Sequence, residues 1–385
     1  MSNKDMGMQR RSMPIVHSRR PVMVALCAAV FLGIGAQAAD AATSPRPASA
    51  PSASKTGTAF KADADMQAVL DALAALGPKP IESLDPVEAR KQPNPADAVM
   101  AVLRQQGRDT APTALVPGVT SVDQSIAGPA GPLPIRIYTP AGAGPFPVIV
   151  YFHGGGWVLA DKNVYDGGSR GLAKQAHAVV VSVDYRLAPE AKFPAQHDDA
   201  LATYRWAAAN AASIKGDPSR LALAGESAGG NLALATALAA RDQRLPAPRH
   251  VLAVYPITQA GDLSTPSYRD SATAKPLNKA MMVWFADKAF SKPEDKKDPR
   301  IDLVHADLKG LPPVTLINAR IDPLRSDADL LAAALKKAGV KVSHKIYDGV
   351  THEFFGMAAV VKKARDAQAY AGQELKRSLG ATSPK

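Results

Sequence analysis

The stretch that decides the fold is Leu221-Ala222-Leu223-Ala224-Gly225-Glu226-Ser227-Ala228-Gly229-Gly230. A short apolar run enters a G-x-S-x-G turn, and an Ala/Leu-rich helical segment, residues 228–240, follows it. Strand, turn and helix in this order are the context of a nucleophile elbow, in which a tight turn holds a serine hydroxyl clear of the backbone. The pattern predicts that Ser227 is a nucleophile. A plain glycine turn with an N-capping serine is the alternative.

Around this turn, apolar runs and helical segments alternate along the chain. The apolar runs are Pro147–Phe152, Val179–Val183, Leu221–Ala224, Val251–Tyr255 and Val314–Ile317. They are mostly apolar rather than alternating, which is typical of a parallel sheet covered by helices on both faces, so we expect an α/β fold. Residues Ser121–Thr139 are expected to form an antiparallel hairpin at the edge of the sheet. Two helical segments, Ala62–Leu76 and Pro95–Gln106, precede every strand, and residues 260–309 break the alternation as an insertion.

A glycine-rich segment, His153-Gly154-Gly155-Gly156-Trp157, follows the first of the buried strands. Backbone N–H groups in such a loop can stabilise the oxyanion of an acyl-transfer intermediate, and the N–H of Ala228 is the expected further donor. A flexible loop or a phosphate cradle is the alternative, but no G-K-[ST] follows and no dinucleotide fingerprint is present. Trp157 is a candidate wall residue of the substrate pocket, although a purely structural role is equally compatible with its position.

A nucleophilic serine needs a base, and the base needs a carboxylate that orients it. His352 lies in a loop beyond the predicted strand Val340–Tyr347, where ligand sites of open α/β sheets occur. Asp322 follows the predicted strand Val314–Ile317, and Asp348 is a weaker alternative because it lies so near His352. The order Ser227, Asp322, His352 agrees with the order that this kind of elbow requires.

Several motifs together resemble the hormone-sensitive-lipase branch of the α/β-hydrolase fold, the bacterial family IV esterases. The matching segments are residues 153–157, 184–190 (Asp-Tyr-Arg-Leu-Ala-Pro-Glu), 225–230, 322–325 (Asp-Pro-Leu-Arg) and 352–354 (His-Glu-Phe). The resemblance implies a mostly parallel eight-stranded sheet, a catalytic triad and an oxyanion hole formed by Gly155, Gly156 and Ala228. It also implies a helical cap from about residues 61–115 and 260–309. Glu226 departs from the family, which more often has Asp before the serine.

This resemblance favours a serine carboxylesterase that acts on short-chain esters through an acyl-enzyme, without a metal or an organic cofactor. A peptidase or amidase on the same fold is one alternative. A non-catalytic ligand receptor is another, but related plant hormone receptors have lost the triad histidine, and His352 is in place here. The expected partner is a small-molecule ester, with neither nucleic acid nor stable membrane association, and a homodimer is an option.

The N-terminus has the features of an export signal. Basic residues precede an apolar run from Val22 to Ala36, and Ala36-Gln37-Ala38 offers a cleavage site. We expect a signal peptide at 1–38, a Pro/Ala/Ser-rich linker at 39–60 and a hydrolase domain at 61–385, with the mature protein periplasmic or secreted. An uncleaved anchor is the alternative, although the run is short for a transmembrane helix.

Composition sets limits on the remaining function classes. The 385 residues are 46% hydrophobic and 21% charged, which excludes a disordered chain and a multi-span membrane protein. One cysteine, Cys27, excludes a disulfide scaffold and a cysteine-based zinc site. The net charge is +11, and removal of residues 1–38 takes away five basic residues and one acidic residue, leaving +7. The remaining lysines are scattered, so we do not expect nucleic-acid binding.

Overall fold

Eight strands pair into one sheet in the order β1-β2-β4-β3-β5-β6-β7-β8. The computed structural model describes residues 60–380, so the predicted signal peptide and almost all of the predicted linker lie outside the described residues. The β1–β2 and β2–β4 pairs are antiparallel and every other pair is parallel. The strands are β1 (Val119–Gly128), β2 (Gly131–Pro140), β3 (Phe146–Phe152), β4 (Val179–Val183), β5 (Gly216–Glu226), β6 (Val251–Val254), β7 (Val314–Ile321) and β8 (Val342–Thr351).

The predicted α/β class and the mostly parallel eight-stranded sheet are confirmed. The edge hairpin is β1–β2, joined at Gly128 and Gly131. The largest difference from the sequence analysis concerns β8, which runs to Thr351 rather than ending near Tyr347. Its last part stays paired with β7, because Thr351 lies opposite Ile321 after a register shift. His352 therefore follows its strand directly.

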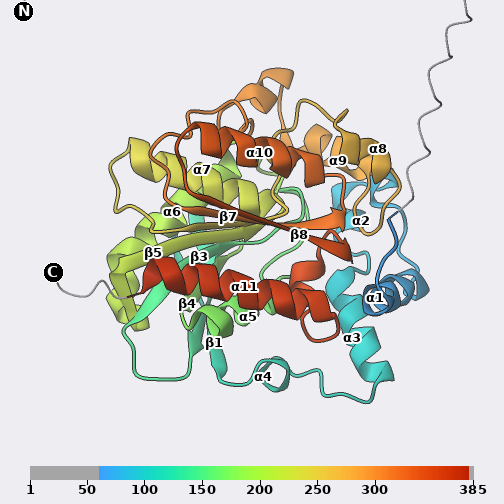
Figure 1. Cartoon of the computed structure of the whole chain (residues 1–385), viewed down its shortest axis with the longest axis horizontal. Helices are drawn as coiled ribbons and strands as arrows, with labels where there is room; N and C mark the ends of the chain where they lie inside the picture. The colour runs from blue at the N-terminus through green and yellow to red at the C-terminus, as the bar shows by residue number, and fades with distance from the viewer. Residues whose placement is uncertain (1–59, 381–385) are drawn as a thin grey trace, which may run out of the picture. The chain divides into compact units, whose positions relative to one another are not determined.

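Helices cover both faces of the sheet (Figure 1). Side chains alternate along each strand, so Ile149 and Tyr151 of β3 face one core cluster, and Val148 and Val150 face the other. The first cluster lies under α5 (Asp166–Ala176) and α11 (Lys362–Leu379). The second lies under α6 (Ala195–Asn210), α7 (Ala228–Asp242) and α10 (Arg325–Lys337). Burial on both faces explains why the central strands β3, β4 and β6 are mostly apolar.

Two helical segments lie outside this layered arrangement. The first, before β1, contains α1 (Ala64–Ala75), η1 (Ile81–Ser83), α2 (Pro86–Ala89), α3 (Pro95–Gln105) and α4 (Pro112–Leu115). The second, between β6 and β7, contains α8 (Pro266–Asp270), α9 (Lys279–Ala289) and η3 (Pro293–Lys297). They contact each other, because Nε1 of Trp284 donates to the carbonyl of Leu84 at 3.1 Å. A short helix after β8, η4 (Phe354–Met357), completes the set.

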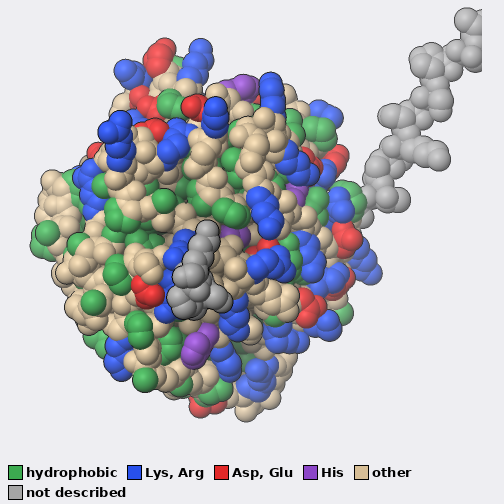
Figure 2. All heavy atoms as spheres, turned by 60° about the vertical axis from the view of Figure 1, so that its left-hand side comes forward, with side chains coloured by type: hydrophobic (Ala, Val, Ile, Leu, Met, Phe, Trp, Pro, Cys, Tyr) green, Lys and Arg blue, Asp and Glu red, His purple; other side chains and the backbone are tan. Residues whose placement is uncertain are grey.

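The charged surface carries both signs. On the face in Figure 2, Lys and Arg side chains are spread among Asp and Glu side chains. Within residues 60–380, no helix is both long enough and apolar enough to cross a membrane.

The turn between β5 and α7 depends on close backbone approach. A Cβ on Gly229 would collide with the carbonyl oxygens of Phe152 and His153, and one on Gly225 would collide with the carbonyl of Gly229. The first turn of α7 is thus packed directly against the end of β3. Backbone atoms cannot yield as a flexible side chain can, so these positions require glycine.

We expect Gly229→Ala to lower the free energy of unfolding by about 1–3 kcal/mol, because the added methyl group overpacks a rigid contact. Gly261→Ala is the matched control: a Cβ there meets nothing within 4 Å. Its effect should stay within about 0.5 kcal/mol. Urea unfolding measures both variants. Equal unfolding midpoints for the two would show that the close contact of α7 with β3 does not constrain the fold.

Candidate active site

Ser227 occupies the turn between β5 and α7 with an unusual backbone conformation. Its φ is 57° and its ψ is −117°, a region that residues other than glycine rarely adopt. The surrounding structure holds this conformation, since the N–H of Ser227 donates to the carbonyl of Val254 at 2.9 Å. Such strain costs on the order of 1–3 kcal/mol and is found mostly at functional sites. The turn presents the Ser227 side chain beside the carboxyl ends of the parallel strands.

His352 and Asp322 meet at that same edge of the sheet. Nδ1 of His352 lies 2.7 Å from Oδ2 of Asp322, and both side chains are almost fully buried. The other carboxylate oxygen, Oδ1, accepts from the N–H of Leu324 at 2.8 Å. Burial alone would lower the pKa of His352, but the negative charge of Asp322 and its hydrogen bond raise that pKa above its ordinary value. The carboxylate also fixes the orientation of the ring, which leaves Nε2 for other contacts.

The other histidines that follow Ser227, and the alternative acid Asp348, have partners elsewhere in the structure. His250 contacts the hydroxyls of Ser378 and Thr315, and His344 contacts the side-chain oxygen of Asn318. His305 is exposed and lies against Asp302. The carboxylate of Asp348 is also exposed and pairs with Arg320 rather than with a histidine.

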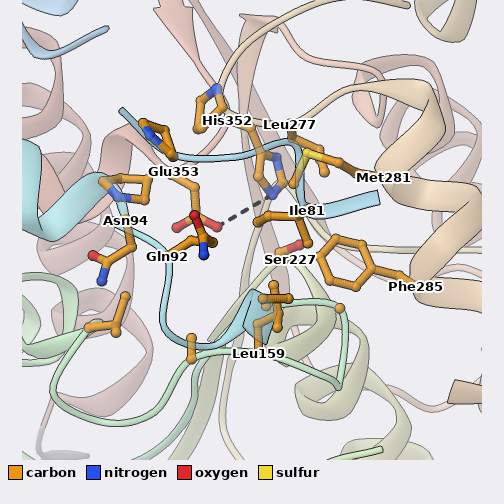
Figure 3. A pocket seen from close by; sticks show the side chains of 18 of the residues that line it. Ile81, Gln92, Asn94, Leu159, Ser227, Leu277, Met281, Phe285, His352 and Glu353 are labelled. Atoms are coloured by element: carbon orange, nitrogen blue, oxygen red, sulfur yellow. Dashed lines mark ion pairs between the residues drawn. The ribbon is translucent and has the colours of Figure 1, made fainter. Parts of the chain in front are cut away.

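Ser227 and His352 both line a cavity of about 210 Å³ (Figure 3). Both helical segments described above contribute to its walls, together with the loop after β3. The apolar part of the lining includes Leu73, Ile81, Leu159, Leu277, Met281 and Phe285. This arrangement places a serine, a histidine and an apolar surface around one small space.

The glycine loop after β3 forms another part of the cavity. Gly155 and Gly156 both line it and have φ values of 89° and 59°. Their positive φ angles favour glycine, and a Cβ on Gly156 would collide with the ring of Phe285. The loop is fixed from behind, because the hydroxyl of Tyr185 donates to the carbonyls of His153 and Gly154 at 2.9 and 3.1 Å. Within residues 60–380, the N–H groups of Gly155 and Gly156 donate to no other backbone carbonyl.

Two other residues singled out from the sequence do not line the cavity. Ala228 is the first residue of α7 and is fully buried, so its backbone can contribute while its side chain cannot. Trp157 is 3% exposed, and its ring packs edge-on against Phe290 at a centroid distance of 5.7 Å. Trp157 is not among the residues that line this cavity, and its packing agrees with the structural role that the sequence analysis left open. The large ring turns into an aromatic cluster beneath the loop, where it removes more apolar surface from water.

The sequence analysis did not anticipate a second group of acids near His352. Glu353 lies in the left-handed region with a φ of 70°, and its Oε1 is 4.0 Å from Nε2 of His352. Glu226 is buried and accepts from the hydroxyls of Tyr151 and Tyr255. Burial raises the pKa of Glu226 to about 8, although both tyrosine hydrogen bonds oppose that shift. Glu226 and Glu353 lie in motifs given in the sequence analysis, but no local sequence pattern predicts that their side chains lie near His352.

Comparisons with known proteins agree with this geometry. Residues 149–356 match a protein family described as having the alpha/beta hydrolase fold. The chain is 39% identical over 254 residues to carboxylesterase NlhH of Mycobacterium tuberculosis. The aligned region covers 65% of this chain and 79% of NlhH. It is 32% identical over 307 residues to ethyl acetate hydrolase of Pseudomonas putida, and this alignment covers 78% of this chain and 92% of that protein. The solved structure of a hyperthermophilic esterase from Pyrobaculum calidifontis superposes with a TM-score of 0.74 at 33% identity. The superposition covers 83% of this chain and 99% of that esterase.

The chain therefore belongs to the α/β-hydrolase family, in the hormone-sensitive-lipase-like branch that its motifs indicated. Its class is that of the carboxylic ester hydrolases, as for the similar proteins above.

Proposed function

We propose that Ser227, His352 and Asp322 hydrolyse carboxylic esters through an acyl-enzyme. The observation that carries this proposal is the 2.7 Å contact between His352 and Asp322 beside the cavity that also contains Ser227. Oγ of Ser227 attacks the ester carbonyl carbon while Nε2 of His352 takes the hydroxyl proton. The same proton then passes to the departing alcohol as the tetrahedral intermediate collapses. Water attacks the acyl-enzyme by the same route and releases the acid.

The negative charge that develops on the carbonyl oxygen needs donors that are already in place. We assign this role to the N–H groups of Gly155, Gly156 and Ala228. Two supports are the positive φ angles that turn the glycine loop and its fixation by Tyr185. The third is the position of Ala228 at the start of α7, where helix N–H groups point outward and the helix dipole favours an anion.

Short acyl chains are the substrate class that fits the cavity best. Its volume of about 210 Å³ is below the range of roughly 300–1,000 Å³ common for ligand pockets. Apolar side chains favour burial of a few methylene groups, and the walls that come from residues 73–95 and 275–285 limit their number. The similar protein from Pseudomonas putida is named for the hydrolysis of ethyl acetate, an ester with a two-carbon acyl group.

For the site of action, we propose export from the cytoplasm. The support lies in residues 1–38, outside the described part of the chain: a basic start, an apolar run of about 15 residues and Ala36-Gln37-Ala38.

Expression in a bacterial host should yield exported protein that begins at Ala39. N-terminal sequencing of the periplasmic fraction and the medium measures this directly. Exported protein that still contains Cys27 would contradict cleavage, because that residue lies in the middle of the apolar run.

Substitution of the three proposed residues should abolish most activity without unfolding the protein. Ser227→Ala and His352→Ala should each lower kcat by about 10³–10⁶, and Asp322→Asn by roughly 10²–10⁴. Asp348→Asn is the matched control, since its exposed carboxylate pairs with Arg320, and its kcat should stay near that of the wild type. A serine-reactive phosphonate should label the wild type and not Ser227→Ala. Full activity in Ser227→Ala would refute the assignment.

Specificity should depend on acyl length. For p-nitrophenyl esters, kcat/KM should rise by roughly fourfold for each methylene added from acetyl toward butyryl or hexanoyl, and then fall. The Phe285→Ala substitution removes a ring from the apolar wall, which enlarges the cavity, and should move the optimum to longer chains. A maximum at laurate or beyond in the wild type, with activation at an oil–water interface, would instead indicate a true lipase.

A further inference from the structure

A second carboxylate faces the proposed catalytic base. Oε1 of Glu353 accepts from the hydroxyl of Tyr165 at 2.6 Å. The same oxygen lies 4.0 Å from Nε2 of His352 (Figure 3). Nδ1 on the other side of the ring is bound to Asp322. The imidazole thus has an acid near each of its two nitrogens. Glu353 also lines the cavity together with Ser227, so its carboxylate borders the space in which the reaction would occur.

The contact is fixed by both partners. The residue next to His352 would normally point away from it, but the left-handed backbone of Glu353 turns its side chain back toward the ring. Tyr165, just before α5, holds the carboxylate there and is itself 4% exposed. Tyr165 and Glu353 are 188 residues apart in sequence, so this hydrogen bond exists only because η4 packs against α5.

Four other titratable groups surround His352. They are Asp322 after β7, Glu226 at the end of β5, Tyr255 after β6 and Tyr165 before α5. Glu226 is mostly protonated at pH 7 because its pKa is raised to about 8. The hydroxyl of Tyr255 stays neutral, since burial raises its pKa well above the usual value. Besides Asp322, the carboxyl groups near His352 are those of Glu226 and Glu353. Because Glu226 is mostly protonated, Glu353 is the one that we expect to be ionised.

The charge of Glu353 is itself coupled to that of His352. Burial raises the pKa of Glu353, whereas a positive His352 and the hydrogen bond from Tyr165 lower it. The carboxylate form is therefore favoured at the moment when the ring becomes an imidazolium. A second cavity of about 630 Å³ is also lined by Tyr165, Glu353 and Glu226.

We propose that Glu353 is a positioning residue for ester hydrolysis: held by Tyr165, its carboxylate faces Nε2 of His352 and stabilises the imidazolium that forms when the ring accepts the proton of Ser227. This inference rests on the proposed function, in which His352 is the base. The proton moves from Oγ of Ser227 to Nε2 and on to the leaving alcohol, and Glu353 takes no proton in the cycle.

The proposal fixes the sign of a pH shift. His352 must be neutral to accept a proton, so kcat/KM falls as the pH drops through the pKa of His352 in the free enzyme. Removal of a nearby negative charge disfavours the imidazolium and lowers that pKa. The acidic limb of Glu353→Gln should therefore move to lower pH by about one unit. The plateau kcat should fall by roughly threefold because the base is weaker, with KM little changed.

Three further variants separate this effect from a merely structural one. Tyr165→Phe removes the hydrogen bond that favours the carboxylate form, so its limb should move in the same direction by a smaller amount. Glu353→Asp keeps a negative charge, so its acidic limb should lie between those of Glu353→Gln and the wild type. Asp348→Asn removes an exposed carboxylate four residues before His352, and its limb should coincide with that of the wild type.

The measurement is kcat/KM for p-nitrophenyl butyrate between pH 4.5 and 9 for each full-length variant, with thermal unfolding to verify folding. A limb that stays in place in both Glu353→Gln and Tyr165→Phe would overturn the role of Glu353 while leaving the proposed function intact. Full activity in Ser227→Ala, or a wild type without an acidic limb, would instead overturn the proposed function. If Glu353→Gln does not fold, the position of the acidic limb in Tyr165→Phe alone tests the role of Glu353.

Discussion

The direct contact between the first turn of α7 and the end of β3 is the constraint on which the site depends. Gly225 and Gly229 leave no room for a side chain, so the backbone can turn sharply enough to hold Ser227 at a positive φ. The same contact brings the glycine loop after β3 next to the start of α7. The proposed nucleophile, Ser227, and the proposed oxyanion donors are therefore positioned by the same packing contact, rather than by separate flexible loops.

The loop that follows β4 gives the site its outer support. Asp184, Arg186 and Glu190 each form an ion pair, with Lys162, Asp199 and Arg90 respectively. Arg90 binds both carboxylate oxygens of Glu190 at 2.7 Å and also donates to the carbonyls of Val158 and Ala188. Since Arg90 directly follows α2 and lines the cavity, this bidentate contact joins the N-terminal helical segment to the loop beside Gly155 and Gly156. The motif thus supports the cavity and takes no part in bond making.

Charge around His352 is arranged in layers. Asp322 is buried and contacts the ring directly, whereas Glu353 faces the opposite nitrogen from a greater distance. Glu226 is also buried and accepts from two tyrosine hydroxyls, and its raised pKa keeps it largely uncharged at neutral pH. A low-dielectric site that held several ionised carboxylates would be unstable, so protonation of Glu226 reduces the repulsion that Asp322 and Glu353 experience.

The sequence by itself determined the elements whose signals are local. Apolar runs predicted the strands, and the glycines around Ser227 predicted the elbow, because a tight turn excludes side chains whatever the rest of the chain does. The spacing of Asp322 and His352 after two strands predicted that they would meet, since the carboxyl ends of parallel strands share one edge. Only the tertiary structure decided that Asp348 pairs with Arg320 and that Trp157 turns into an aromatic cluster. The contact of Tyr165 with Glu353 likewise joins distant segments whose packing depends on crossover connections, and for such contacts the local sequence carries no signal.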